Sequence, residues 1–157
     1  MARTLKLIPT LCLLVACTCG AGTQIPVVSP RATQITGVAG SGLSMQIDLL
    51  IHNPNGYDLT VYALRADVTA QGRDLGTVES ATQIVLTGGQ WTSYTTQVVV
   101  PWGDLPSLAA SALFQASVPY HVDGTVMVHG PGGYTVRVPF VMDGQIPRGM
   151  LIRIPGL

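Results

Sequence analysis

Apolar and polar residues alternate along most of the chain after residue 33. This two-residue period is typical of β-strands that bury one face. It predicts a strand over residues 44–51, whose buried face is formed by Met45, Ile47, Leu49 and Ile51. A second long strand is predicted over residues 59–70, with a buried face formed by Tyr62, Leu64, Ala66 and Val68.

Turn residues separate these strands from each other and from the strands that follow. Asn53-Pro54-Asn55-Gly56 ends the first strand, because proline lacks a ladder donor and asparagine and glycine tolerate positive φ. Residues 71–74 (QGRD) predict a hairpin-like turn into a strand over residues 75–79, and residues 130–133 (GPGG) predict a tight loop. The remaining strands are predicted over residues 82–87, 92–100, 121–129 and 134–142.

One segment has helical spacing instead. Residues 104–115 carry leucine and alanine at three- and four-residue intervals, with Asp104 as the N-cap and Pro106 in the first turn. Seven or eight strands with one short helix predict an all-β fold. The expected architecture is an antiparallel β-sandwich of the immunoglobulin or fibronectin type III kind, with the helix at one end.

The first 16 residues have the layout of a secretory signal peptide. Arg3 and Lys6 precede a short apolar run over residues 7–16. A helix of about ten residues rises roughly 15 Å, about half the thickness of a bilayer core. The run therefore predicts a cleaved signal and not a membrane-spanning helix.

The apolar run ends in a motif that resembles the bacterial lipobox. Residues 14–17 (LVAC) give an aliphatic residue, a tolerated residue, a small residue and a cysteine. Cleavage is therefore expected after Ala16, and the Cys17 thiol is expected to take the diacylglyceryl group of a palmitate-type anchor. The alternative is an ordinary secretory signal that is cut near Ala21 and discards Cys17.

Composition divides the remaining chain into two parts. Residues 17–31 are rich in Thr, Gly, Ser and Pro and predict a flexible stalk, and residues 32–157 form the predicted domain. Cys12 lies in the signal and Cys17 takes the lipid, so that Cys19 alone is left and no disulfide is expected in the domain. Cys19 is either without a role, a second acylation site or, least favoured, a redox group.

The charge balance excludes nucleic acid as a partner. The whole chain has eight basic and eight acidic side chains, and removing Arg3 and Lys6 with the signal leaves a net charge of about −2. Such a surface does not attract phosphate backbones or anionic lipid headgroups.

Residues that could carry chemistry are few and scattered. His121 and Asp123 are expected on the same face of one strand, and His129 lies roughly 27 Å further along an extended strand, so no compact zinc site is expected. His52 is expected to bond the neighbouring turn. Trp91 and Trp102 flank one strand, and we expect them to plug the ends of the core, with an exposed ligand platform as the alternative.

Enzyme signatures are absent from the sequence. Gly40-Ser41-Gly42 is too short for a nucleophile elbow, and the chain has no lysine after Lys6, which excludes Schiff-base and P-loop chemistry. The carboxylates fall mostly at turns, and no opposed pair is predicted. No catalytic residue and no cofactor is therefore expected.

The order of these strands and turns resembles a known family. A strand that ends in Asn-Pro-Asn (IDLLIHNPNGYDLTV) is followed by VYALRADVTAQG, by Asp-Leu-Gly and by a late YHVDGTVMV segment. Residues 32–145 are therefore similar to the late embryogenesis abundant type 2 family, also called the water stress and hypersensitive response domain. Asn53-Pro54-Asn55 is the most specific feature, and Gly72 and Gly144 fit the family's turns.

The resemblance implies a fibronectin-like sandwich, secreted or lipid-anchored forms in bacteria, a link to desiccation tolerance and no agreed active site. The expected function is that of a non-enzymatic envelope protein, anchored by its lipid to the outer membrane and facing the periplasm, which protects or binds other molecules under stress. The alternative is an accessory lipoprotein subunit of an envelope transport or assembly complex, with an envelope protein as partner. An exposed apolar patch at a sheet edge would favour the subunit.

Overall fold

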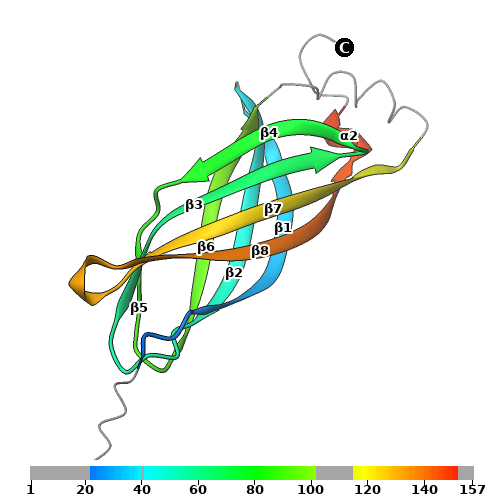
Figure 1. Ribbon diagram of the computed structural model, residues 1–157. Helices are drawn as coiled ribbons and strands as arrows, with labels where there is room; N and C mark the ends of the chain where they lie inside the picture. The colour runs from blue at the N-terminus through cyan, green and yellow to red at the C-terminus, as the bar shows by residue number, and fades with distance from the viewer. Residues whose placement is uncertain (1–21, 40, 102–114, 152–157) are drawn as a thin grey trace, which may run out of the picture.

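Two antiparallel sheets pack face to face in a sandwich (Figure 1), and this confirms the predicted fold class. The computed structural model describes residues 22–39, 41–101 and 115–151. The first sheet has the order β1-β2-β6 and consists of β1 (Val27–Ala39), β2 (Gly42–His52) and β6 (Trp91–Pro101). The second sheet has the order β4-β3-β7-β8.

The second sheet contains five strands, because a short strand also pairs with β3 beside β4. Its strands are β3 (Leu59–Ala70), β4 (Arg73–Ser80), β5 (Ile84–Leu86), β7 (Ser117–His129) and β8 (Thr135–Pro147). The described helices are a 3-10 turn, Pro131–Gly133, and α2, Arg148–Leu151. Residues 104–114 of the predicted helix lie outside the described residues.

The core lies between the two inner faces. The inward-facing residues Met45, Ile47, Leu49 and Ile51 of β2 are at most 2% exposed, as their alternation predicted. Thr33 of β1 and the buried Tyr120 of β7 share a hydrogen bond between the two sheets, with their side-chain oxygens 3.1 Å apart. Burial raises the pKa of Tyr120, and the hydrogen bond to Thr33 offsets this only in part.

The prediction for the buried face of β3 was wrong at Tyr62. The register passes from Val61, opposite Val128, to Ala63, opposite Met127, so Tyr62 has no partner on β7. This β-bulge shifts the buried positions from odd to even residues. The half-buried Tyr62 therefore leaves the core, and its ring stacks on His129 with the ring centroids 3.9 Å apart.

The predicted boundary between stalk and domain also needs correction. β1 begins at Val27, so residues 27–31 belong to the sheet and not to a flexible stalk. Val27 and Val28 favour a strand, and Pro30 is tolerated because β1 is an edge strand whose register shifts just after Pro30.

The two glycines expected at turns differ in their role. Gly72 has a φ of +74° in the turn between β3 and β4, as predicted. Gly144 lies inside β8 opposite Tyr120, and a Cβ there would come within 2.3 Å of the tyrosine ring. Gly124 and Phe140 form the same kind of pair, since a Cβ at Gly124 would come within 2.2 Å of the phenylalanine ring. The prediction of a turn at Gly144 was therefore wrong, because that glycine makes room for an aromatic ring.

Candidate functional site

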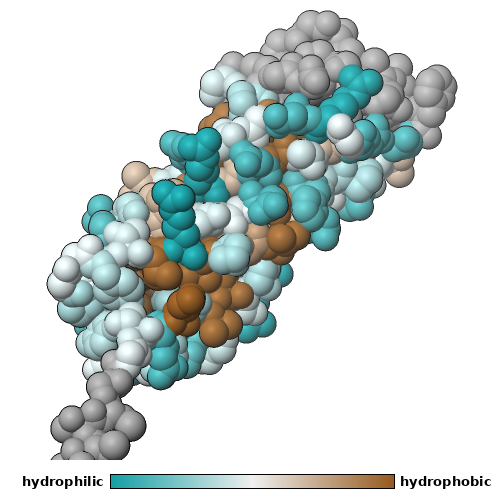
Figure 2. Space-filling view, in the orientation of Figure 1, coloured by the Kyte–Doolittle hydropathy of each residue, from teal (hydrophilic) through white to brown (hydrophobic). Residues whose placement is uncertain are grey.

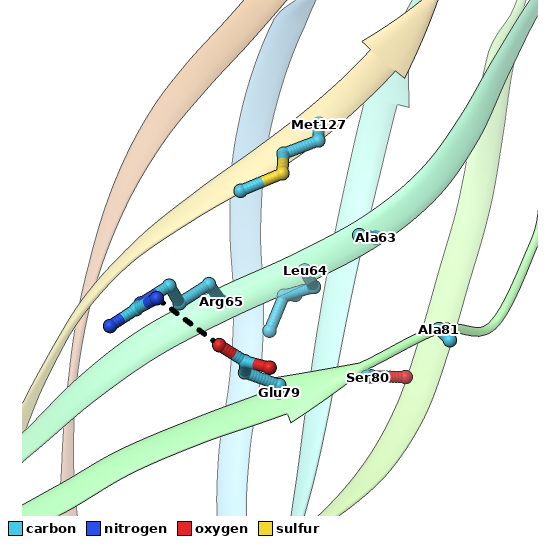
Figure 3. Close-up of a pocket in the computed structure, with 7 residues that line it drawn as sticks. All are labelled: Ala63, Leu64, Arg65, Glu79, Ser80, Ala81 and Met127. Carbon is cyan, nitrogen blue, oxygen red and sulfur yellow. Dashed lines mark ion pairs between the residues drawn. The ribbon is translucent and has the colours of Figure 1, made fainter.

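An apolar hollow opens where strand β3 loses its edge partner. β4 pairs with β3 from Leu64 onward, and β5 pairs with β3 only as far as Val61, so Tyr62 and Ala63 pair with neither. The hollow at this gap has a volume of about 330 Å³ (Figure 3). It is lined by Ala63, Leu64, Arg65, Glu79, Ser80, Ala81 and Met127.

The side chains around the hollow suit an apolar group. Figure 3 shows the Met127 side chain on one side of β3 and the Glu79 carboxylate on the other. Glu79 pairs with Arg65 at 3.2 Å, but both side chains are more than half exposed, so this ion pair contributes little to stability. A flexible thioether beside alanine and leucine offers dispersion contacts to a hydrophobic side chain and no group for catalysis.

Hydroxyl groups fix one rim of the hollow. The Ser80 and Thr96 side-chain oxygens lie 2.6 Å apart, and the Ser80 hydroxyl also donates to the Thr82 hydroxyl at 3.0 Å. Thr96 belongs to the other sheet and is buried. These bonds tie the chain between β4 and β5 to β6, so the rim is held in place before anything binds.

The surface around the hollow is partly hydrophobic. Figure 2 shows a hydrophobic area on the face of the molecule that carries β3, β7 and β8, bordered by hydrophilic side chains. On the outer face of the second sheet, Val85 and Val141 are each more than half exposed. Sequence reasoning missed this site, although the shift of apolar positions from Val61 to Leu64 was a visible signal of the bulge.

His121 and Asp123 lie exposed on the same face of β7, as predicted. The contact that His121 makes is with the neighbouring strand β8, where its Nδ1 atom lies 2.8 Å from Oδ1 of Asp143. Asp123 lies opposite Asp67, so an opposed pair of carboxylates does exist, contrary to expectation. The expectation failed because strand register is a long-range property. Both carboxylates face solvent, and Asp67 accepts a hydrogen bond from Thr77.

The other histidines make ring contacts. His129 stacks on Tyr62, and its Nδ1 lies 3.1 Å from the Thr135 hydroxyl. His52 packs against Trp91, with the ring centroids 4.9 Å apart, and makes no hydrogen bond to the turn within the described residues. No three His, Cys, Asp or Glu side chains in the described part of the chain are placed to hold a metal ion.

The prediction that Trp91 plugs the core was wrong. Trp91 is the first residue of β6, points away from the core and is 52% exposed. It pairs with His52, which alternates with the buried Ile51 and therefore lies on the outer face. Trp102 lies outside the described residues.

Asn53 joins its own turn to the connection between β5 and β6. Its side chain is fully buried, and Nδ2 donates to the carbonyls of Tyr57 at 2.7 Å and of Leu86 at 2.9 Å. Its Oδ1 accepts from both the backbone N–H and the Nδ2 of Asn55, each at 3.0 Å. The backbone N–H of Asn53 donates to the Gln90 carbonyl at 3.1 Å.

Asn55 holds the segment by which the chain enters the domain. Its Oδ1 accepts from the Gln24 backbone N–H, and its Nδ2 donates to the Gln24 carbonyl, both at 2.8 Å. Tyr57 adds a hydrogen bond from its hydroxyl to Thr23 at 2.8 Å. With Pro54 between the two asparagines, the turn fixes both the end of β2 and the segment at Gln24 that precedes β1.

Cys17 and Cys19 lie outside the described residues. In the part of the chain that the structure describes, no helix is long and apolar enough to cross a membrane.

Comparison with known proteins finds a family and a set of similar folds. The family model described as late embryogenesis abundant protein matches residues 48–144. No curated protein matches the sequence.

Three solved structures share the fold at low sequence identity. A crystal structure of an Archaeoglobus fulgidus protein is 8% identical, with a TM-score of 0.59, and the match covers 76% of this chain and 97% of that one. A solution structure from Arabidopsis thaliana is 17% identical, with a TM-score of 0.56 and coverages of 76% and 80%. The solution structure of a candidate late embryogenesis abundant (LEA) protein is 16% identical, with a TM-score of 0.52 and coverages of 85% and 79%.

Proposed function

Because the chain belongs to the late embryogenesis abundant protein family, we propose that it is a non-enzymatic protein that protects or binds other molecules under water stress. We further propose that it works in the bacterial cell envelope, anchored to the outer membrane by a lipid on Cys17 and facing the periplasm. The family membership supports the stress-related part of this proposal. The anchor and the location rest on the sequence.

Two observations support the anchor. Residues 14–17 (LVAC) close a short apolar run behind Arg3 and Lys6, which is the layout of a lipoprotein signal. Gln24, seven residues after Cys17, is bonded to Asn55 in the domain. A lipid at Cys17 would therefore be only seven residues away in sequence from a position that is fixed in the domain.

The polar side chains of the described residues support a role without catalysis. His121, Asp123 and Asp143 lie exposed on the outer face of the second sheet, and the hydroxyl contacts there, of Thr77 with Asp67 and of Thr135 with His129, are open to solvent. Catalysis needs groups held in a water-excluding site with matched pKa values. The Asn53–Asn55 network is buried but engaged in bonds that hold the fold.

The apolar hollow beside Ala63 and Met127 is the observation that carries a binding role. It lies at a gap in the edge of a sheet, where β3 has neither β4 nor β5 as its neighbour. An extended, partly unfolded client presents apolar side chains and unpaired backbone groups, and both can be accommodated at such a gap. Shielding of this kind lowers aggregation while water is scarce.

The same gap gives the second candidate function its support. An accessory subunit of an envelope transport or assembly complex would dock one partner protein there instead of many clients. Pull-down of the intact lipoprotein from detergent-solubilised membranes separates the two functions. A single stoichiometric partner indicates the subunit, and a range of substoichiometric proteins indicates the protective role.

We expect a strain without the gene to survive drying and osmotic shock less well, and the wild-type gene to restore survival. Met127→Glu should fail to restore it, because a charge in the apolar hollow must be desolvated when a client binds. Val99→Glu is the matched control, since it adds the same charge at an exposed position of the other sheet, opposite Ser44 and outside the hollow.

Single substitutions of His121, Asp123 or Trp102 should leave complementation intact while the fold persists. If one of them abolished survival in a folded, membrane-bound protein, a specific polar site would replace the protective role. Full restoration by Met127→Glu would exclude the hollow as the binding place.

A further inference from the structure

One end of the sandwich carries a row of exposed apolar residues. Val27, His52 and Trp91 are neighbours across β1, β2 and β6 on the outer face of the first sheet. Val27 and Trp91 are each 52% exposed, and Ile25, two residues before Val27, is 64% exposed. Further along the same face most side chains are polar, with the Asp48 carboxylate accepting from Gln46 and Thr95, although Leu50 and the exposed Val99 also lie there.

The loops at this end are rich in aromatic residues and poor in charge. Figure 1 shows β5, the start of β1 and the β7–β8 loop at the same end, and α2 at the other. Three half-buried tyrosines lie in or next to these loops, at positions 57, 62 and 134. In residues 53–58, 87–90 and 130–134 the one charged side chain is Asp58, whose carboxylate accepts from the Gly88 N–H at 3.0 Å.

The opposite end is different in character. The β3–β4 turn carries Arg73 and Asp74, and α2 begins with Arg148, all of them exposed. We call the end that carries Ile25, Val27 and Trp91 the apolar end; among the described residues, it has fewer charged side chains than the opposite end.

The chain enters the domain at the apolar end. Gln24 is bonded to Asn55 there, directly before the exposed Ile25. Five residue steps separate Cys17 from Gly22, a reach of at most about 18 Å when fully extended. A flexible linker of that length spans about 12 Å on average. The headgroup layer of a bilayer is roughly 5–8 Å thick on each side.

We propose that this apolar end, formed by Ile25, Val27 and Trp91 with His52 between the strands, docks onto the lipid surface at the boundary of headgroups and acyl chains. This rests on the proposed lipid at Cys17, which holds the end at a high effective concentration beside the bilayer. Tryptophan favours that boundary because its ring is apolar and its N–H can bond to headgroups.

Docking of this kind fixes the orientation of the domain relative to the membrane. The charge-poor end loses little hydration at the surface, and the charged end points away from it. Because the contact is apolar and the described residues at this end form no basic patch, its strength should not depend on anionic lipid or on salt. The hollow beside Met127, on the other sheet, stays open to the periplasm.

The test uses the intact lipoprotein with Trp102→Phe, which leaves Trp91 as the one tryptophan, in phosphatidylcholine vesicles. Flotation of the vesicles reports the lipid anchor, and Trp91 fluorescence reports the docking. Relative to the Cys17→Ser protein in solution, we expect Trp91 emission at shorter wavelength, quenching by lipids brominated near the headgroup, and loss of quenching by acrylamide. The result should be the same with anionic vesicles and in high salt.

Ile25→Ser with Val27→Ser should abolish the shift, and Val85→Ser with Val141→Ser, equally exposed valines of the other sheet, should keep it. A protein that floats with the vesicles while Trp91 remains as accessible as in solution overturns the docking and leaves the anchor standing. Shielding of Trp91 without quenching by brominated lipid overturns it in favour of contact between two copies. A protein that does not float refutes the anchor, and the docking with it.

Discussion

Asn53→Ala is expected to lower the free energy of unfolding by about 3 kcal/mol or more, the largest effect of any single polar substitution in the domain. The side chain is fully buried and makes four hydrogen bonds. Its loss leaves the carbonyls of Tyr57 and Leu86 and an N–H of Asn55 without their partner, at about 1–3 kcal/mol for each group that water cannot reach. Chemical denaturation of purified domain measures the change.

Two further variants separate hydrogen bonding from shape. Asn53→Asp keeps the size of the side chain but replaces its two donors with an acceptor that faces carbonyls, so it should be at least as destabilising as Asn53→Ala. Asn55→Ala should cost less, about 1 kcal/mol, since part of its bonding is to the segment at Gln24 near the protein surface. A loss below 1 kcal/mol for Asn53→Ala would show that the network does not hold the loops together.

The expected cost is larger than the turn motif suggests. The sequence alone predicts that a turn asparagine forms hydrogen bonds with its own neighbours. On that basis, replacing it with alanine lowers the free energy of unfolding by on the order of 1 kcal/mol. The structure adds the Leu86 carbonyl, 33 residues away, as an acceptor of the same side chain. Local signals predict that a turn exists, but they do not show which distant loop shares its donors.

Cys17→Ser is expected to move the protein from the membrane fraction to the soluble fraction. Serine cannot form the thioether to diacylglycerol, and two or three acyl chains hold a protein firmly while one holds it only marginally. The exposed Ile25, Val27 and Trp91 are too few to retain the domain without that lipid. Fractionation of cells followed by a carbonate wash measures the distribution.

Cys19→Ser is the matched control, because it makes the same atomic change two residues away. It should leave the protein in the membrane fraction. If Cys17→Ser stays in the membrane through the carbonate wash, an uncleaved apolar helix over residues 7–16 is the better explanation.

Much of the sandwich was predictable because most strands bury one face. The alternation from Met45 to Ile51 located β2. Gly72 in the QGRD segment predicted a turn, and the structure gives that glycine a positive φ. Errors arose where one residue breaks the period, as at Tyr62, or where an edge strand is short of apolar residues, as over residues 27–31.

The candidate site was not predictable in the same way. The hollow depends on where β4 stops and β5 starts along β3, and no local pattern at Ala63 or Met127 specifies that. The register between strands also decides that Asp67 faces Asp123. It likewise places Gly144 opposite Tyr120, whose ring lies against that glycine. Pairing across strands decides these contacts, so they become visible only in the folded chain.

The proposed envelope location and the proposed docking of Trp91 both depend on the proposed lipid on Cys17, and one measurement tests that lipid most directly. Mass spectrometry of the mature protein, extracted from membranes with detergent, reads its first residue and its modification. We predict a chain that begins at Cys17 and bears a diacylglyceryl group with its acyl chains. An unmodified chain that begins near Gly22 would contradict the anchor and show that an ordinary secretory signal had been removed.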